Sequence, residues 1–144
     1  MAGNVDSTTD SARCPCGTGE VYGSCCGRFH RGEAHAPTAE ALMRSRYSAF
    51  AVRDVVYLAR TWHPSTRPAD VGTEDLDLDE EQRWLRLDVL ETAAGGPFDD
   101  DGTVLFEARW RRVTDRGTER GVLRERSRFV REQGRWSYLD GEPA

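Results

Sequence analysis

Four cysteines packed into thirteen positions constrain this chain more than any other feature. Their spacing is C-x-C-x8-C-C, and they are all the cysteines that the chain has: Cys14, Cys16, Cys25 and Cys26. Two pairs of thiolates from two chain segments can surround one soft divalent ion as a tetrahedron. Gly17 and Gly19 allow the loop between the pairs to turn, and Gly27 does the same where the chain leaves it. The spacing therefore predicts a structural Zn²⁺, one per chain.

Two disulfides, or free redox thiols, are the alternatives. Neighbouring cysteines such as Cys25 and Cys26 rarely bond to each other, and two cross-bridges in so short a loop would be strained. Four sulfur ligands leave no coordination position for water, so we expect the ion to fold the chain and not to perform chemistry. His30 is a spare candidate ligand; alternatively, its ring packs beside the loop or caps it.

The cysteine-containing stretch, residues 14–27, resembles the SEC-C zinc motif, which is named for its place in the SecA translocase. With the Gly-Arg-Phe-His-Arg-Gly run that follows from Gly27, it resembles the start of the YchJ-like bacterial proteins. Thr18 stands where the motif usually has Ser, and Cys26 stands where SecA commonly has His.

A length of 144 residues suits one domain with a small appendage. We expect a disordered tail over residues 1–13, a zinc knuckle over 14–32 and the main domain over 37–141. No apolar run approaches the roughly 20 residues that cross a bilayer, and the amino-terminal residues lack the features of a signal peptide. Without an export signal, and with metal-binding thiols, the chain is expected in the cytoplasm.

Charge is distributed unevenly along the chain. The net charge of −5 argues against a general nucleic-acid coat protein. Residues 69–101 hold twelve acids and two arginines, whereas residues 109–135 hold ten arginines and four acids. Salt bridges between neighbouring surfaces would explain this, with the acidic Asp70–Glu81 segment as an internal partner. The alternative is an RNA or acidic-protein surface formed by Arg124, Arg126 and Arg128.

The first half of the domain reads as helical. Thr38 can cap a helix whose apolar residues recur at helical spacing up to Phe50. Asp54 can cap a second helix, which must end by His63 because Pro64 disfavours helical geometry before it. The Asp70–Glu81 segment is a loop or a poorly anchored short helix.

The second half reads as antiparallel strands. Leu85, Leu87 and Val89 alternate with Arg86, Asp88 and Leu90. Residues 104–113 and 123–129 also alternate, and the last strand runs through residues 136–139. Two or three helices followed by a strand meander predict an α+β fold, with the helices packed on one face of a curved sheet.

The resemblance to YchJ-like proteins continues through this half. Residues 38–48, the Thr-Trp-His-Pro-Ser-Thr-Arg-Pro run at 61–68, residues 107–109 and residues 125–138 all share it, so it spans about 14–141. The resemblance implies a cystatin-like cone domain of the NTF2 and SnoaL kind, which encloses a pocket between its helices and its concave sheet.

Polar residues that point into such a pocket are the candidates for function. The sheet pattern places Glu125 and Ser127 on the same face as Phe129, and Arg46 interrupts the apolar face of the first helix. We therefore expect an Arg46–Glu125 pair in the pocket or at its mouth. It would either fix how the helix docks or orient a ligand.

No catalytic set stands out. His63 could act as a base near neutral pH together with Tyr47, Trp62 and Glu125, but the Trp-His-Pro run reads equally well as a helix terminator. The candidates for catalysis are His63 and Glu125. The expected pocket residues are Arg46, Tyr47, Trp62, His63, Glu125, Ser127 and Phe129.

Three functions fit the sequence. The first is an interaction module, because the resemblance to the SecA motif implies a protein or ribonucleoprotein partner. The second is a small-molecule binder, isomerase or hydrolase that uses the cone pocket. The third is a nucleic-acid binder that uses the arginine-rich strand. Cone domains often pair, so a homodimer is left open, and no part of the chain is expected to insert into a membrane.

Overall fold

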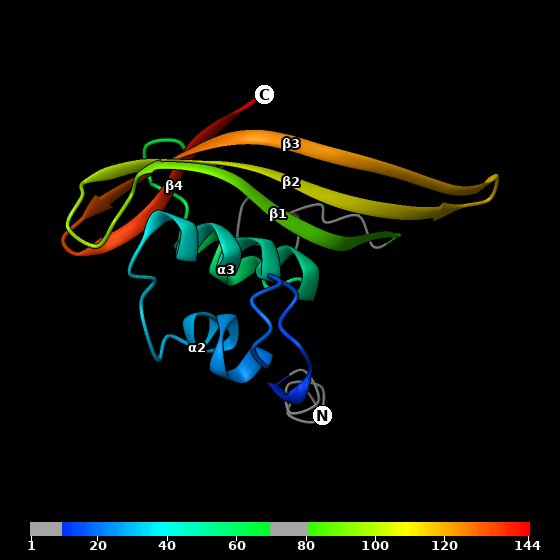
Figure 1. The fold of residues 1–144 in the computed structure, drawn as a ribbon, viewed down its shortest axis with the longest axis horizontal. Helices are drawn as coiled ribbons and strands as arrows, with labels where there is room; N and C mark the ends of the chain where they lie inside the picture. Colours follow the sequence, from blue (N-terminus) through cyan, green and yellow to red (C-terminus); the bar gives the residue numbers. More distant parts are fainter. Residues whose placement is uncertain (1–9, 70–80) are drawn as a thin grey trace.

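The computed structural model describes residues 10–69 and 81–144. Helices lie on one face of a single antiparallel sheet, and the amino-terminal knuckle lies on the far side of the longest helix (Figure 1). The elements, in chain order, are η1 (Tyr22–Ser24), α2 (Cys26–His30), α3 (Ala39–Val52), α4 (Val55–Arg60), β1 (Gln82–Ala94), β2 (Asp101–Thr114), β3 (Gly117–Glu132) and β4 (Arg135–Pro143). The predicted α+β class, with helices on a curved antiparallel sheet, is confirmed.

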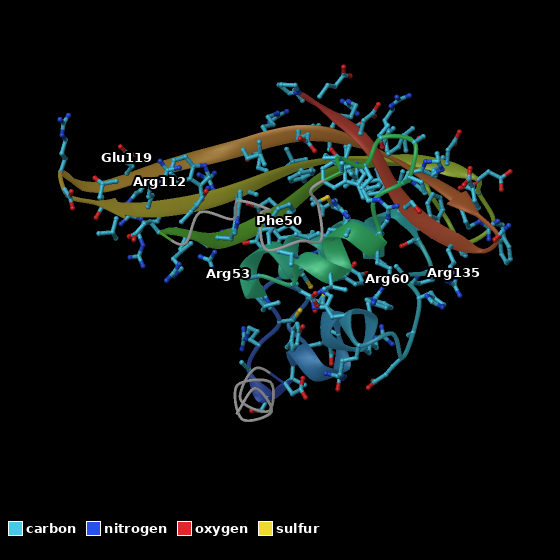
Figure 2. All side chains as sticks on the ribbon, turned by 180° about the vertical axis from the view of Figure 1, so that it is seen from behind. Phe50, Arg53, Arg60, Arg112, Glu119 and Arg135 are labelled. Carbon is cyan, nitrogen blue, oxygen red and sulfur yellow. The ribbon has the colours of Figure 1, made fainter. Side chains whose placement is uncertain are left out.

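The four strands form a meander in the order β1-β2-β3-β4. The hairpin between β2 and β3 extends well beyond the helices (Figure 1). Arg112 and Glu119, which oppose each other across this hairpin, mark its outer part in Figure 2. The helices therefore cover only part of the sheet, and the uncovered end of its concave face borders the pocket described below.

Helix α3 begins where its cap predicts. The Thr38 hydroxyl accepts a hydrogen bond from the Ala41 amide at 3.0 Å, which satisfies one of the free amides of the first turn. The helix ends at Arg53, whose φ of 65° is left-handed, and the Arg53 amide returns to the Ala49 carbonyl. Both ends are thus fixed locally.

Helix α4 follows at once and is short. The Asp54 carboxylate accepts from the Tyr57 amide at 3.0 Å, as its position predicts. After the helix ends, the chain runs beside β4: Thr61 and His63 exchange backbone hydrogen bonds with Tyr138 at 2.7 and 2.8 Å. These bonds fasten the turn after α4 to the sheet.

The main core lies between α3 and the concave face of the sheet. Its members from α3 include Leu42, Met43 and Tyr47, and those from the sheet include Phe106 and Phe129. The alternation predicted for β2 and β3 is confirmed, but that for β1 is wrong at one residue. A register shift between Trp84 and Arg86 turns Leu85 outward, where it is 49% exposed, and places Trp84 on the inner face.

The expected tail is too long. Asp10 binds Arg31 at 2.8 Å, Arg13 pairs with Val21 in a β-bridge, and the Ala12 carbonyl accepts from the Tyr22 amide at 2.8 Å. Residues 10–13 are therefore part of the knuckle. Residues 1–9, and the acidic segment except for Glu81, lie outside the described residues.

Candidate functional site

The four cysteine sulfurs converge on one point. All four Sγ atoms lie within 4.8 Å of one another, and the Sγ atoms of Cys16 and Cys25 are 3.7 Å apart. A tetrahedron with metal–sulfur bonds of about 2.3 Å has edges of about 3.8 Å. All four cysteines are free, so the disulfide alternative does not hold. The sulfurs can hold one metal ion, and the donor set fits a four-coordinate soft-metal site.

Two hydroxyls lie against these sulfurs. Thr18 Oγ1 is 3.2 Å from the Sγ of Cys25, and Ser48 Oγ, on α3, is 3.5 Å from the Sγ of Cys14. When the cysteines are thiolates, both hydroxyls donate, which orients the sulfurs and balances their charge. Thr18, which stands where the motif usually has Ser, therefore supplies a hydroxyl next to the sulfurs.

The loop between the cysteine pairs needs two of its glycines for their backbone angles. Gly17 and Gly19 have φ values of 86° and 92°, which side chains rarely adopt. Gly27 has another role than the predicted one. It lies inside α2, and a Cβ there would come within 2.8 Å of the Tyr22 carbonyl oxygen, so close packing and not a turn requires the glycine.

His30 packs beside the metal loop and is not aimed at the sulfurs. Its Nδ1 accepts from the Tyr22 hydroxyl, and its Nε2 donates to the Ser45 carbonyl at 2.8 Å. Both ring nitrogens are occupied by these bonds. Burial lowers the pKa of His30, so the ring is neutral at pH 7, as this bonding pattern requires.

The knuckle is docked on α3 through polar bonds and an apolar contact. Arg44 donates to the Cys16 carbonyl at 2.8 Å, and His30 and Ser48 add the bonds described above. Phe29 packs in a cluster with Ala49 on α3 and with residues of α4. The metal site is therefore joined to the domain body through α3.

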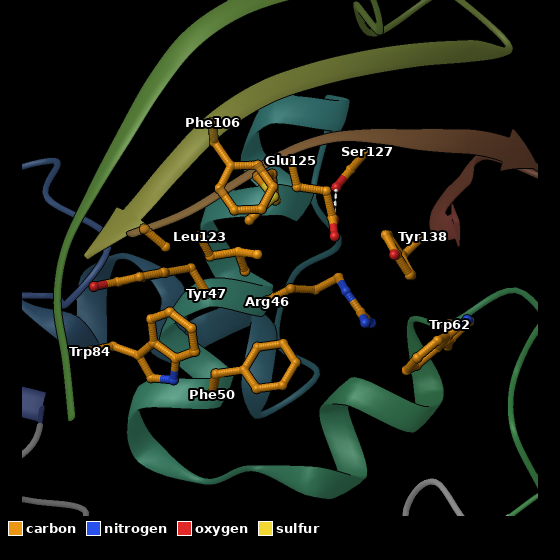
Figure 3. Close-up of a pocket in the computed structure, with 12 residues that line it drawn as sticks. Arg46, Tyr47, Phe50, Trp62, Trp84, Phe106, Leu123, Glu125, Ser127 and Tyr138 are labelled. Atoms are coloured by element: carbon orange, nitrogen blue, oxygen red, sulfur yellow. Dashed lines mark hydrogen bonds between the residues drawn. The ribbon is translucent and has the colours of Figure 1, made fainter. Parts of the chain in front are cut away.

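A cavity of about 220 Å³ lies on the opposite side of α3, against the concave sheet (Figure 3). Helix α3 contributes four lining residues at helical spacing, i, i+3, i+4 and i+7: Met43, Arg46, Tyr47 and Phe50. The sheet and the turn after α4 contribute the others: Trp62, Trp84, Phe106, Ala108, Leu123, Glu125, Ser127 and Tyr138. The floor includes Phe106 and Ser127, both buried, whereas Leu123 is 40% exposed and marks the mouth.

Arg46 is the main polar group of this cavity, and it is 4% exposed. Its Nη1 donates to the Leu58 carbonyl at 2.9 Å and to the Thr61 hydroxyl at 2.7 Å, and its guanidinium lies 4.6 Å from the centre of the Tyr138 ring. Burial lowers the pKa of Arg46 to about 10, so the side chain stays charged at pH 7. The guanidinium thus completes the end of α4, where helix carbonyls lack partners.

Glu125 shares the cavity with Arg46, but the two do not form the predicted ion pair. The Ser127 hydroxyl donates to Glu125 Oε2 at 2.6 Å (Figure 3). Arg46 instead bonds to Leu58 and Thr61, although the Glu125 carboxylate is near enough to favour the charge of the guanidinium. The prediction was wrong because the end of α4 supplies acceptors that are closer to Arg46.

Only some of the other residues expected in the pocket line the cavity. Tyr47 and Trp62 line the cavity together with Arg46, Glu125 and Ser127, whereas His63 and Phe129 do not. His63 bonds to Glu132 and Ser65 at 3.0 and 2.7 Å, away from Glu125, and Phe129 is a core residue. The four-residue acid/base set is therefore not assembled.

Several lining residues were not identified from the sequence. Phe50 and Trp84 come together at the mouth with their rings 6.4 Å apart, and Tyr138 forms an edge contact with Trp62 at 5.2 Å. Helical spacing from Tyr47 could have identified Phe50. Trp84 could not have been found this way, because the irregularity of β1 decides which way it points.

The arginines of β3 meet carboxylates on the other strands of the sheet. Arg124 binds Glu107 at 3.0 Å, and Arg128 holds Asp140 through two bonds of 2.6 and 2.5 Å. Arg126 lies 4.0 Å from Glu91. Arg128 lowers the pKa of Asp140, as expected for a close pair. These acids come from the sheet itself, and the predicted acidic segment lies outside the described residues.

Within the described parts of the chain, no helix has the length and apolarity needed to span a lipid bilayer.

Comparison with known proteins gives consistent matches for both parts of the chain. Residues 38–141 match the family described as YchJ, middle NTF2-like domain, and residues 11–28 match the SEC-C motif. A UPF0225 protein of Streptomyces avermitilis is 53% identical over 136 residues, covering 94% of this chain and 88% of the relative. One from Corynebacterium efficiens is 52% identical and covers 92% and 94%.

Solved structures agree with the fold. A SEC-C motif containing protein from Rhodopseudomonas palustris, solved in solution, superposes with a TM-score of 0.74 at 36% identity and covers 92% of this chain and 98% of its own. A crystal structure of a SEC-C motif containing protein from Psychrobacter arcticus gives a TM-score of 0.68 at 26% identity, with coverage of 95% and 85%. The chain therefore belongs to the UPF0225 family and combines a SEC-C motif with a YchJ-type NTF2-like domain.

Proposed function

We propose that this protein binds a small molecule in the cavity between α3 and the sheet, and that a zinc-bound knuckle supports the helix that forms one wall. The observation that carries the proposal is the cavity itself: an apolar, largely aromatic enclosure that holds a few converging polar groups. This combination is typical of ligand sites. Arg46 and Glu125 would orient the ligand, and the aromatic rings would supply contact area.

Zn²⁺ is the ion that fits the knuckle best. Four thiolates in a closed tetrahedron suit zinc, and such a set leaves no position for a substrate. The bonds from Ser48 and Arg44 to the metal loop support a mechanical role, because they tie the loop to the same helix that lines the cavity. Metal-bound thiols also agree with a cytosolic protein.

We favour binding over catalysis. Among the described residues that line the cavity, Glu125 is the one carboxylate, and no histidine or cysteine is present. His63, the expected base, bonds to Glu132 outside the cavity. A lone carboxylate can transfer a proton, but its possible partners in the lining are Tyr47 and Tyr138, and burial raises the pKa of both hydroxyls to about 12, far from the range of an acid/base group near neutral pH.

A fragment screen read by NMR tests the proposal, since the indole N–H groups of the four tryptophans give separate signals. Bound fragments should shift the signals of Trp62 and Trp84, which line the cavity, and leave Trp136 unchanged. Ala108→Leu would fill the cavity floor and should abolish these shifts while leaving the unfolding temperature within a few degrees of wild type. If no fragment shifts Trp62 or Trp84, or if Ala108→Leu leaves binding intact, the cavity is not a ligand site.

An interaction module is the second candidate, and the exposed loop of the knuckle favours it. Glu20 is exposed between the cysteine pairs, and next to it Val21 is 43% exposed, while the backbone of both residues is hydrogen-bonded or paired with residues 13–14. Such a surface suits a protein or ribonucleoprotein partner. Val21→Asp should prevent capture of that partner while keeping the metal, and capture that is unchanged by this substitution would exclude the knuckle as the contact.

A further inference from the structure

The cavity contains hydrogen-bond donors and an acceptor that have no partner among the described residues. A ligand must match these groups to bind there. On the donor side, Arg46 uses only Nη1 for Leu58 and Thr61. Its Nε and Nη2 have no acceptor among the described residues, although the residue is only 4% exposed. The Arg46 nitrogens are not sealed off from the cavity, so a bound acceptor can reach them, and Trp62 Nε1, on the wall of the same cavity, is a fully buried donor without a partner among the described residues.

The acceptor is Glu125, which uses one carboxylate oxygen for a hydrogen bond within the protein and has the other one available. Oε2 accepts from Ser127, whereas the other oxygen has no hydrogen-bond donor among the described residues, and the carboxyl group lies on the side of the cavity that faces Arg46 (Figure 3). The carboxylate also lies directly against the backbone of β4. A Cβ at Gly141, the residue opposite Ser127 on that strand, would collide with Oε2. A glycine at this point is therefore needed for Glu125 to lie where it does.

The charges of these two side chains select against a charged ligand. An anion attracted to Arg46 would come close to the Glu125 carboxylate, and a cation attracted to Glu125 would come close to the guanidinium. Either ion would also lose its hydration in a cavity that is mostly apolar, and transfer of an unpaired charge from water is costly. A neutral molecule avoids both penalties.

Resting on the proposed binding function, we infer that the ligand is a small, flat, neutral molecule of the amide or lactam class. Its carbonyl oxygen accepts from Nε or Nη2 of Arg46, and its neighbouring N–H donates to Glu125. Its apolar body lies among the rings of Tyr47, Phe50 and Trp84. A cavity of about 220 Å³ accommodates a ring system of about two fused rings.

Three matched probes test the polarity of the site: 2-naphthamide, which is neutral, 2-naphthoate, which is negative, and 2-naphthamidine, which is positive. They share one ring system and differ in charge and in donors and acceptors. Titrations of the zinc-loaded protein, followed through the indole signals of Trp62 and Trp84, should give a dissociation constant for 2-naphthamide at least about tenfold below those of both charged probes. Trp136 serves as the internal reference.

Glu125→Gln separates charge from shape, because glutamine keeps the size of the side chain and removes its negative charge. In this variant the preference for 2-naphthamide over 2-naphthoate should fall at least about tenfold, since Arg46 then acts on the anion without opposition. Glu132→Gln, which changes an exposed carboxylate outside the cavity, should leave the preference unchanged.

Tighter binding of either charged probe, equal binding of all three, or no effect of Glu125→Gln would overturn the ligand class. So would failure of all three probes while other fragments still shift Trp62 and Trp84, and in that case the binding function stands. Only the loss of every fragment at these tryptophans refutes the binding function itself, so the two failures are distinguishable.

Discussion

Replacing Arg46 by Met tests whether this buried charge serves stability or binding. Methionine keeps the apolar stem and removes the guanidinium. A tenfold change in an ionisation constant corresponds to about 1.4 kcal/mol. The fall of the Arg46 pKa from 12.5 to about 10 through burial therefore means that the charged form is destabilised by roughly 3 kcal/mol. The substitution removes this cost.

Two losses oppose that gain. The Leu58 carbonyl at the end of α4 loses its donor, and an unsatisfied buried acceptor costs about 1–3 kcal/mol. The contact of the guanidinium with the Tyr138 ring contributes about 1 kcal/mol more. The Thr61 hydroxyl is less affected because it also donates to the Tyr57 carbonyl. The free energy of unfolding should therefore stay within about 1 kcal/mol of wild type.

Denaturant unfolding of the zinc-loaded protein at pH 7, followed by circular dichroism, measures this difference. Arg116→Met, at the exposed hairpin tip, is the matched control and should change the free energy of unfolding by less than about 0.5 kcal/mol. A loss of about 3–5 kcal/mol in Arg46→Met would match the removal of one partner of a buried ion pair. That result would mean that Arg46 and Glu125 pair directly in solution. It would refute the argument that the cost of burying the Arg46 charge nearly cancels the stability gained from its contacts.

Three further predictions concern the metal, pH and the pocket. Native mass spectrometry should find one metal ion per chain in the wild type and none in Cys26→Ala, and this variant should lower the free energy of unfolding by more than about 2 kcal/mol. Ser24→Ala should keep both the ion and the stability, and a metal-free chain of wild-type stability would contradict the prediction. Because burial lowers the pKa of His30, the unfolded chain takes up a proton below about pH 6.5 that the folded chain refuses, so stability falls from pH 7 to 5, and His30→Gln should reduce that fall in parallel unfolding curves. A slope unchanged by this variant would show that His30 does not titrate as described. Gly141→Ala should displace Glu125 and weaken 2-naphthamide binding at least about fivefold with the metal content unchanged, and undiminished affinity would mean that the carboxylate does not contact the probe.

Much of this protein was predictable because the relevant physics is local. The cysteine spacing, with glycines at two positions of positive φ, identifies the metal loop without any knowledge of the rest. The caps Thr38 and Asp54 fix where α3 and α4 begin, because each side chain bonds to an amide three residues away. Strand alternation gave the inner faces of β2 and β3, since period two holds wherever a strand is regular.

The predictions failed where contacts between distant segments decided the outcome. The irregularity of β1 reversed the direction of Leu85 and brought Trp84 into the cavity. His63 was directed outward by the backbone pairing of its turn with Tyr138, a residue more than seventy positions away. No local pattern reports such pairing.

The sequence by itself determined a four-sulfur site, two capped helices and an antiparallel meander, because bonds and steric limits between near neighbours set these features. The tertiary structure alone decided that the knuckle and the cavity lie on opposite sides of α3. It also decided that Arg46 bonds to the end of α4 and not to Glu125. The physical reason is that a buried charge bonds to whichever acceptors packing brings nearest, and packing depends on the whole chain at once.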